Sequence, residues 1–299
     1  WSAQTDADIP VSFNVSDGRN VLWKKPLEES GQSGIAVWED RLFLTIMEPF
    51  DGDKKDPFKT GTIRALCIDA NSGEIIWQYD IEAANEGGYL YGFSDSSSPT
   101  PIVDGEHVWL TNAGGKLVCL NWKGELVWKR SWRMATEILK PEKPFPFNKQ
   151  HEPFLVNGLL VNMEAYDSDD GERELGWHYL YGLDKRTGEV KWISEDAVTH
   201  YNTPGYSLDA LGKPTALIGR GGYHAVPEGP KGYSMIDLRD GKQIWRTELA
   251  GPRDTALYNS SFTKRFAVWF SETESRITVL NSQNGEIVKT IDLRSMVDL

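Results

Sequence analysis

Three of the five histidines, with a neighbouring tyrosine and an arginine, are the side chains of this 299-residue sequence best suited to acid–base chemistry. A neutral histidine or tyrosine can remove a proton from a carbon next to a carboxylate, and an arginine can neutralise that carboxylate. Polysaccharide lyases use this chemistry. The candidate catalytic residues are His151, His200, Tyr201, Arg220 and His224. Each is equally compatible with an ordinary loop or channel position that holds water and backbone groups.

A second set of candidates consists of polar and aromatic residues that recur at equivalent places in five repeat units. Each lies where the first strand of a unit is expected to begin. If these strand starts converge on one channel mouth, their side chains can bind a saccharide-like ligand or a protein partner. The ligand-binding candidates are Ser97, His151, Glu152, Tyr201, Asn202, Tyr258 and Asn259.

Metal and phosphate chemistry receive weaker support. The run DSDDGERE at residues 167–174 makes Asp167, Asp169 and Asp170 weak calcium candidates, but it lacks the spaced bidentate glutamate of an EF-hand loop and also reads as a solvated loop. The histidines show no zinc-ligand spacing. The GRGG run at residues 219–222 is not followed by the Lys-Ser/Thr of a phosphate loop. We therefore expect no bound metal.

The elements that must position these residues follow from one repeated turn. Residues 67–77 read CIDANSGEIIW, 120–128 LNWKGELVW, 182–192 GLDKRTGEVKW, 235–245 MIDLRDGKQIW and 280–289 LNSQNGEIVK, and VLW at 21–23 resembles an isolated ending. An apolar strand leads into Asp or Asn, whose side chain can bond the backbone two residues on, and Gly then supplies a positive φ. A short β-rich run follows, so each copy predicts a hairpin.

A second hairpin precedes each copy, as in PIVDGEHVWLT at residues 101–111 and PFLVNGLLVNM at 153–163, where Asp-Gly and Asn-Gly mark the bend. Two hairpins per unit and a period of about 50 to 65 residues indicate an all-β propeller of four-stranded antiparallel blades. We expect an arm at 1–20, a closing strand at 21–27, and five blades at about 31–82, 95–133, 150–196, 200–250 and 254–294.

The pattern [A/I/L]-D-x-x-[T/S]-G-x-x-x-W, seen at residues 68–77 and 183–192, resembles the tryptophan-docking repeat of the pyrroloquinoline-quinone-like (PQQ-like, quinoprotein-type) β-propeller superfamily. The resemblance extends over about residues 20–293. It implies that the repeat tryptophans dock between adjacent blades. It also implies a ring of six to eight blades, so a single domain over residues 1–299 would be incomplete at its C-terminus, or a second chain would complete the ring.

For function, the resemblance allows three hypotheses. The leading one is an extracytoplasmic recognition or scaffold module that binds a ligand or partner protein at the channel mouth. The alternative is a carbohydrate-active lyase that uses the same residues. The third is a PQQ-dependent oxidoreductase, although the calcium ligands and catalytic Asp of quinoprotein dehydrogenases find no matching positions here. Neither PQQ nor calcium is therefore expected as a cofactor.

Composition limits the partners. A net charge of −12 disfavours nucleic acid and anionic membrane surfaces, which require a basic patch. No apolar run approaches the length of a membrane span. A periplasmic or extracellular location follows from the superfamily resemblance alone, because the two cysteines, Cys67 and Cys119, are expected as buried free thiols.

Overall fold

A computed structural model describes residues 10–50, 52, 60–84, 95–139, 152–199, 203–209, 211–221, 229–249, 261–271 and 274–296. Its secondary structure is almost entirely β. Each of five sheets contains four strands in sequence order, and every neighbouring pair is antiparallel. The predicted all-β class and the four-stranded antiparallel sheets are therefore confirmed.

The strand bounds show the same spacing in every sheet. The first sheet contains β1 (Ala36–Trp38), β2 (Arg41–Met47), β3 (Ile63–Asp69) and β4 (Ile75–Ile81), and the second β5 (Ile102–Val103), β6 (His107–Asn112), β7 (Lys116–Asn121) and β8 (Leu126–Ser131). The third contains β9 (Phe154–Val156), β10 (Leu159–Ala165), β11 (His178–Asp184) and β12 (Val190–Ala197). The fourth contains β13 (Gly205–Leu208), β14 (Pro214–Arg220), β15 (Gly232–Asp237) and β16 (Gln243–Glu248), and the fifth β17 (Ser261–Phe262), β18 (Phe266–Ser271), β19 (Arg276–Asn281) and β20 (Ile287–Asp292).

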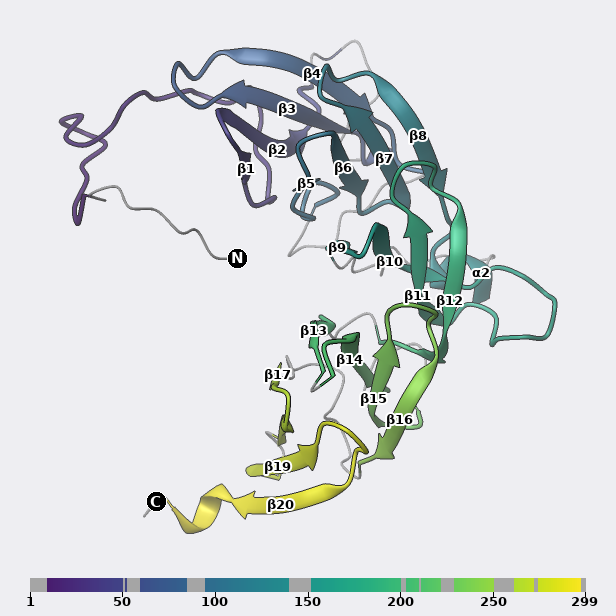
Figure 1. Ribbon diagram of the computed structural model, residues 1–299. Coiled ribbons are helices and arrows are strands. Elements are labelled where there is room, and N and C mark those ends of the chain that lie inside the picture. The colour runs from purple at the N-terminus through teal and green to yellow at the C-terminus, as the bar shows by residue number, and fades with distance from the viewer. Residues whose placement is uncertain are drawn as a thin grey trace.

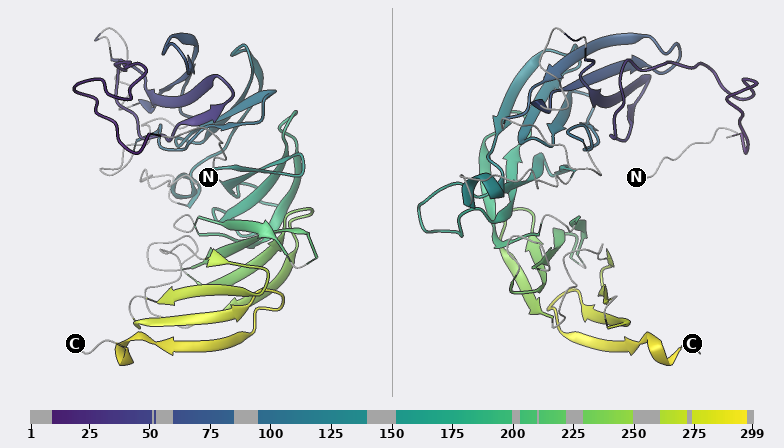
Figure 2. Two further views of the ribbon diagram at one scale, coloured as in Figure 1. Left: turned by 60° about the vertical axis from the view of Figure 1, so that its left-hand side comes forward. Right: turned by 180° about the vertical axis from the view of Figure 1, so that it is seen from behind.

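The five sheets follow one another around a crescent (Figure 1). The first strand of each sheet lies on the concave side, and the fourth strand lies on the convex side. The first and the fifth sheets lie at the two ends of the crescent, as the view from behind also shows (Figure 2). A short helix α2 (Ala135–Leu139) follows the second sheet, and a 3-10 turn η1 (Leu293–Ser295) follows the fifth.

The repeated turn between the third and fourth strands has the expected mechanism. In the first sheet, the Asp69 carboxylate accepts hydrogen bonds from the backbone N–H groups of Asn71 at 3.0 Å and Ser72 at 2.8 Å. Gly73 then adopts a φ of 76°, which a side chain would strain. A register shift of the β-bulge type occurs just before this turn in all five sheets. The same local chemistry therefore produces the same hairpin five times.

The core lies between sheets rather than within one layer. Each seam between consecutive sheets encloses its own apolar cluster. In the seam between the second and third sheets, Trp109 and Cys119 of the second sheet pack with Tyr181 and Leu183 of the third. Both cysteines are buried and free, as expected.

Residues 21–27, predicted to be a closing strand, pair with none of the described strands. A β ladder needs a neighbouring strand, so their role in closing a ring stays a prediction. Trp23 nevertheless takes the expected docking position. Its indole lies against Gly73, its Nε1 donates to the Ala70 carbonyl at 2.7 Å, and it packs on the outer face of the first sheet with Leu44 and Ile46.

Candidate functional site

Most of the channel-mouth candidates lie outside the described residues. These are His151, His200, Tyr201, Asn202, His224, Tyr258 and Asn259. Their proposed ligand-binding and catalytic roles stay predictions. The described residues include Ser97, Glu152, Arg220 and the three aspartates of the acidic run.

Ser97 links the first two sheets. Its side chain is fully buried, and its hydroxyl donates to Asp95 Oδ1 at 2.6 Å while accepting from the backbone N–H of Gln32 at 3.0 Å. The Ser97 carbonyl accepts from the Thr45 hydroxyl at 2.9 Å. These bonds use the hydroxyl for contacts between blades, so in this conformation Ser97 offers no surface to a ligand.

Glu152 and Arg220 also bond within the protein. Glu152 is exposed, and its Oε1 accepts from the backbone N–H of Thr100 at 3.2 Å, which ties the third sheet to the second. Arg220, at the end of β14, is only 3% exposed and donates to the Pro230 carbonyl at 3.2 Å. Burial, followed by the positive charge of Arg246, lowers the pKa of Arg220 to about 10. Ser97, Glu152 and Arg220 do not bond one another. Ser97 and Glu152 each contact a neighbouring sheet, whereas Arg220 donates to carbonyls of its own sheet.

The acidic run at residues 167–174 is an exposed loop whose carboxylates bond protein groups. Asp167 accepts from Arg133 Nε at 2.7 Å. Asp170 accepts from the hydroxyls of Tyr166 and Ser168, and the Tyr166 hydrogen bond is the main reason that its pKa lies below the ordinary value. Asp169 is exposed. Within the described ranges, no group of three or more His, Cys, Asp or Glu side chains is arranged to hold a metal ion.

Several polar and aromatic contacts between neighbouring sheets lie at one end of the sheets, where each sheet contributes two turns. We call this end the hairpin rim. It comprises the first turns of the sheets, at residues 39–40, 104–106, 157–158, 209 with 211–213, and 263–265, and the repeat turns, at 70–74, 122–125, 185–189, 238–242 and 282–286.

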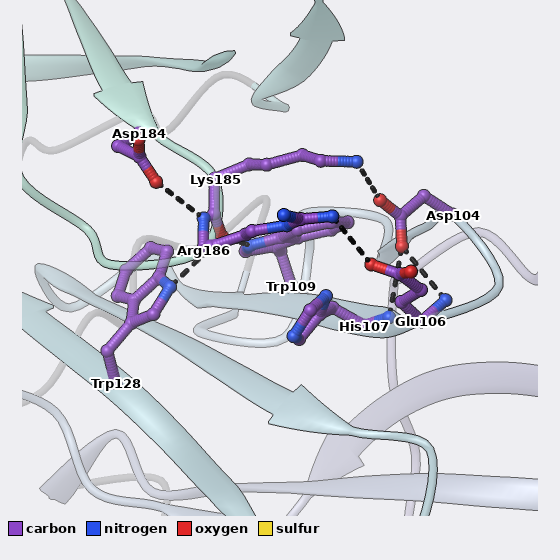
Figure 3. Close-up of polar contacts among 8 residues, drawn as sticks. All are labelled: Asp104, Glu106, His107, Trp109, Trp128, Asp184, Lys185 and Arg186. Atoms are coloured by element: carbon purple, nitrogen blue, oxygen red, sulfur yellow. Dashed lines mark hydrogen bonds and ion pairs between the residues drawn. The ribbon is translucent and has the colours of Figure 1, made fainter. Parts of the chain in front are cut away.

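The seam between the second and third sheets is locked at the hairpin rim (Figure 3). The carbonyl of Lys185 accepts from the indole Nε1 groups of Trp109 and Trp128, both at 3.1 Å, while its ammonium forms an ion pair with Asp104. Arg186 pairs with Glu106 at 3.4 Å. Burial opposes ionisation of Asp104, but the Lys185 contact and two backbone N–H bonds hold the pKa of this carboxyl below its ordinary value.

The seam between the first and second sheets uses different side chains at the same places. The Arg41 guanidinium lies 4.7 Å from the centroid of the Trp122 ring and donates to the Trp122 carbonyl at 2.6 Å. Trp77 Nε1 donates to that carbonyl at 3.3 Å. The Trp38 indole lies against Gly105 of the next sheet and stays 39% exposed. Sequence reasoning identified the docking tryptophans but missed these charged and aromatic contacts, which join turns of neighbouring blades.

Hollows also open at the seams. A cavity of about 430 Å³ opens at the hairpin rim between the fourth and fifth sheets. Another, of about 360 Å³, lies beside the acidic run between the second and third sheets, where the buried Glu164 carboxylate accepts from Arg130 Nε at 2.8 Å. The Arg130 guanidinium also lies 5.4 Å from the Tyr181 ring centroid.

Comparison with known proteins identifies the architecture. The family model described as outer membrane protein assembly factor BamB matches residues 59–296. Among solved structures, BamB from Moraxella catarrhalis is similar at 16% identity and a TM-score of 0.53, covering 90% of this chain and 64% of that one. A europium-containing methanol dehydrogenase (12% identity, TM-score 0.55) covers 88% of this chain and 51% of that one. Quinohemoprotein alcohol dehydrogenase from Comamonas testosteroni (14%, TM-score 0.54) covers 88% and 43%.

No curated protein sequence matches the chain. The chain spans between 43% and 64% of the lengths of these solved proteins. At sequence identities this low, the structural similarity shows a shared fold only. Among the described residues, no helix combines the length and apolarity that a membrane span requires. The propeller architecture of the neighbours and the repeated tryptophan docking confirm the PQQ-type resemblance, and the family match over most of the sequence shows that this chain belongs to the family of the outer membrane protein assembly factor BamB.

Proposed function

We propose that this chain is part of an extracytoplasmic scaffold whose hairpin rim binds a partner protein. The observation that carries the proposal is the way successive turns are joined. Arg41 on Trp122 and Lys185 with Asp104 connect neighbouring blades, so the rim is a preformed surface. A preformed surface loses little conformational entropy when it binds, which favours affinity for a protein.

Exposed apolar side chains on this rim supply suitable contacts. Trp38 is 39% exposed and Leu211 is 79% exposed, and both lie on or beside first turns of sheets. Tryptophan is among the residues that contribute most to protein–protein binding energy, especially when its surroundings are held in place. The family description, which names outer membrane protein assembly, supports both a protein partner and a periplasmic or extracellular location.

Of the residues considered for catalysis, Arg220 lies among the described residues, where it is buried and donates to a backbone carbonyl of the protein. A ligand site at the channel mouth, formed by His151, Tyr201, Asn202, Tyr258 and Asn259, would be a second contact region of the same scaffold.

Photocrosslinking tests the scaffold in its natural host. A benzophenone amino acid replaces Trp38 or Leu211 on the rim of the natural full-length protein, and Ile76 on the convex outer strand β4 serves as an exposed control at 45%. We expect one discrete protein adduct from the rim positions and none from Ile76. The adduct partner, purified, should bind the unmodified protein with a measurable Kd. Absence of any rim adduct, together with new unsaturated-product absorbance on uronic-acid polysaccharides, would replace the scaffold with the lyase.

The proposal also includes a further sheet, which would cover the exposed face of β18. Alternate residues of β18 leave Phe266, Val268 and Phe270 exposed by 39% to 43%, whereas the equivalent face of β6 packs Trp109 against the next sheet. We propose that another blade, from the same polypeptide or from a second chain, covers this face in a ring of six to eight blades.

Thiol labelling tests this coverage. A cysteine replaces Val268 on the proposed interface or Val288, 54% exposed on the outer strand β20, in the natural full-length protein. The two native cysteines are buried and do not interfere. The Val268 cysteine should label far more slowly than the Val288 cysteine, and equal labelling rates would refute the covering blade.

A further inference from the structure

One position of the repeat controls whether each seam is filled at the hairpin rim. It is the residue immediately after the turn Asp or Asn, whose carbonyl accepts the docking tryptophan in most seams. In the second and third sheets, its side chain contacts a residue in or next to the first turn of the preceding sheet. From the second to the fifth sheet, this residue is Trp122, Lys185, Leu238 and Ser282.

The first three of these side chains close their seams. Trp122 stacks with Arg41, and Lys185 pairs with Asp104. Leu238 is buried in the apolar cluster against which Phe154 and Val156 of the third sheet pack. Ser282 is the smallest of the four and reaches no equivalent partner among the described residues. The cavity of about 430 Å³ lies at this place, with Ser282 in its lining.

The cavity has an apolar part and a charged part. Met235, Ile244 and Phe262 contribute apolar surface, and Lys213 and Lys264 contribute exposed ammonium groups. Its volume lies within the range of small-ligand sites, which combine apolar walls with a few polar groups. An occupant with an apolar side chain and a flanking negative charge would satisfy both parts.

The carboxylates of the lining already have partners within the protein. Asp209 Oδ1 accepts from the backbone N–H groups of Leu211 at 2.7 Å and Lys213 at 2.8 Å. Asp237 accepts from Arg239 Nε at 2.9 Å, and this contact lowers the pKa of Asp237. The charge of Lys213 also lowers the pKa of Asp237, so Lys213 already lies near a carboxylate. Lys264 is exposed and forms no ion pair among the described residues, so its ammonium is the positive charge most available to an incoming ligand, although the whole chain is acidic.

We infer that the cavity between the fourth and fifth sheets binds an acidic peptide segment of the partner protein, with an apolar side chain against Phe262 and carboxylates at Lys213 and Lys264. This inference rests on the proposed scaffold function and names the chemistry of its partner. The small residue Ser282 makes the site possible, because the larger residues at this position fill the other seams.

Fluorescence polarisation with the natural full-length protein tests the inference. The probes are a fluorescein-labelled peptide of sequence DEFLDE and its charge-reversed form KKFLKK. Ser282→Trp should fill the cavity, and Lys264→Glu should reverse a charge at an exposed position where folding is not at risk. Lys123→Glu is the matched control, since Lys123 is an exposed lysine of the second sheet's repeat turn, away from the cavity lining.

We expect saturable binding of DEFLDE that weakens with added salt, and about tenfold or greater loss of affinity in Ser282→Trp and Lys264→Glu but not in Lys123→Glu. Equal binding of KKFLKK, or wild-type affinity in both cavity variants, would overturn the inference. So would a failure of DEFLDE to bind, as when another segment or a second copy already fills the cavity. If the rim still yields its photocrosslinked partner, the scaffold function survives that failure. If peptide binding behaves as expected but no partner is crosslinked, the scaffold function fails and the cavity specificity stands.

Discussion

The indole of Trp128 lies directly against Gly188 of the next sheet, so that a Cβ at residue 188 would approach the indole Cε3 to 2.7 Å. Gly188 also has a φ of 75°. The glycine thus serves both the turn and the seam, and the same geometry recurs where Trp77 meets Gly124 and Trp192 meets Gly241.

Two glycine-to-alanine substitutions separate the role in the turn from the role in the seam. Gly158→Ala, at a φ of 79° with no atom within 4 Å of the added Cβ, should cost only the backbone strain, about 1 kcal/mol. Gly188→Ala should cost about 2 kcal/mol more, because the indole must move. Urea denaturation followed by fluorescence measures both. Equal losses would mean that the indole adapts freely.

The hydrogen bond of a docking tryptophan can be tested by a matched pair. Trp245 Nε1 donates to the Ser282 carbonyl at 2.8 Å, whereas Trp192 Nε1 is buried without a partner among the described residues. Both tryptophans are under 10% exposed. Trp245→Phe should therefore destabilise the protein by about 1 kcal/mol more than Trp192→Phe, measured as the free energy of unfolding.

The ion pair between Arg130 and Glu164 should be costly to break, because the Glu164 side chain is 1% exposed. Arg130→Met leaves that carboxylate without its cation and should lower the free energy of unfolding by about 3 kcal/mol. Arg186→Met, which removes a pair whose side chains are both more than 60% exposed, should change it by less than about 1 kcal/mol.

The double variant Arg130→Met with Glu164→Leu is the decisive control. It removes both charges and should recover most of the loss from Arg130→Met alone. A double variant that is less stable than the single one would show that packing of the Arg130 stem, rather than charge, accounts for the effect.

The cysteines give a pH-dependent prediction. Burial raises the pKa of Cys67 to about 11 and that of Cys119 to about 12. An unfolded thiol ionises at about pH 8.5, whereas the buried thiols of the folded state stay protonated to higher pH. Ionisation therefore stabilises the unfolded state first, and the free energy of unfolding falls as the pH rises above that value. The loss should approach about 1.4 kcal/mol per pH unit for each thiol until the folded thiols ionise.

Denaturation between pH 8 and pH 11 measures this slope. A variant with Ala at positions 67 and 119 should lose the thiol contribution while keeping that of other groups. At pH 8, a thiol reagent should label the folded protein slowly and label both cysteines after unfolding. Rapid labelling of the folded protein would contradict the buried placement.

The hairpins could be predicted from sequence because their causes are local. Asp69 caps its own turn, and Gly73, a few residues later, adopts the positive φ that the turn requires. The same residue pattern therefore forms the same hairpin in each copy. The strand predicted at residues 21–27 depends on a neighbouring strand, which no local signal can supply. The buried role of Ser97 likewise depends on an adjacent sheet.

The seam cavity was missed for a related reason. Taken alone, Ser282 is an ordinary turn residue. Its small size becomes informative only when it is compared with Trp122, Lys185 and Leu238 at the same repeat position. That comparison uses sequence alone and could have indicated a gap at one seam. The depth and charge of the cavity still required the arrangement of two sheets.

Tryptophan docking on glycine also bears on how such proteins change in length. Each of the first four sheets presents an indole to the next sheet and a glycine turn to the preceding tryptophan, whereas the fifth sheet has Lys289 at the indole position. The five contacts, from Trp23 on Gly73 to Trp245 on Gly285, have the same form. Duplication or deletion of one of the first four sheets therefore leaves every remaining junction with a tryptophan and a glycine. The number of blades can therefore change in evolution while the contacts between neighbouring blades stay the same. Closure of the ring is then the condition that limits the number of blades.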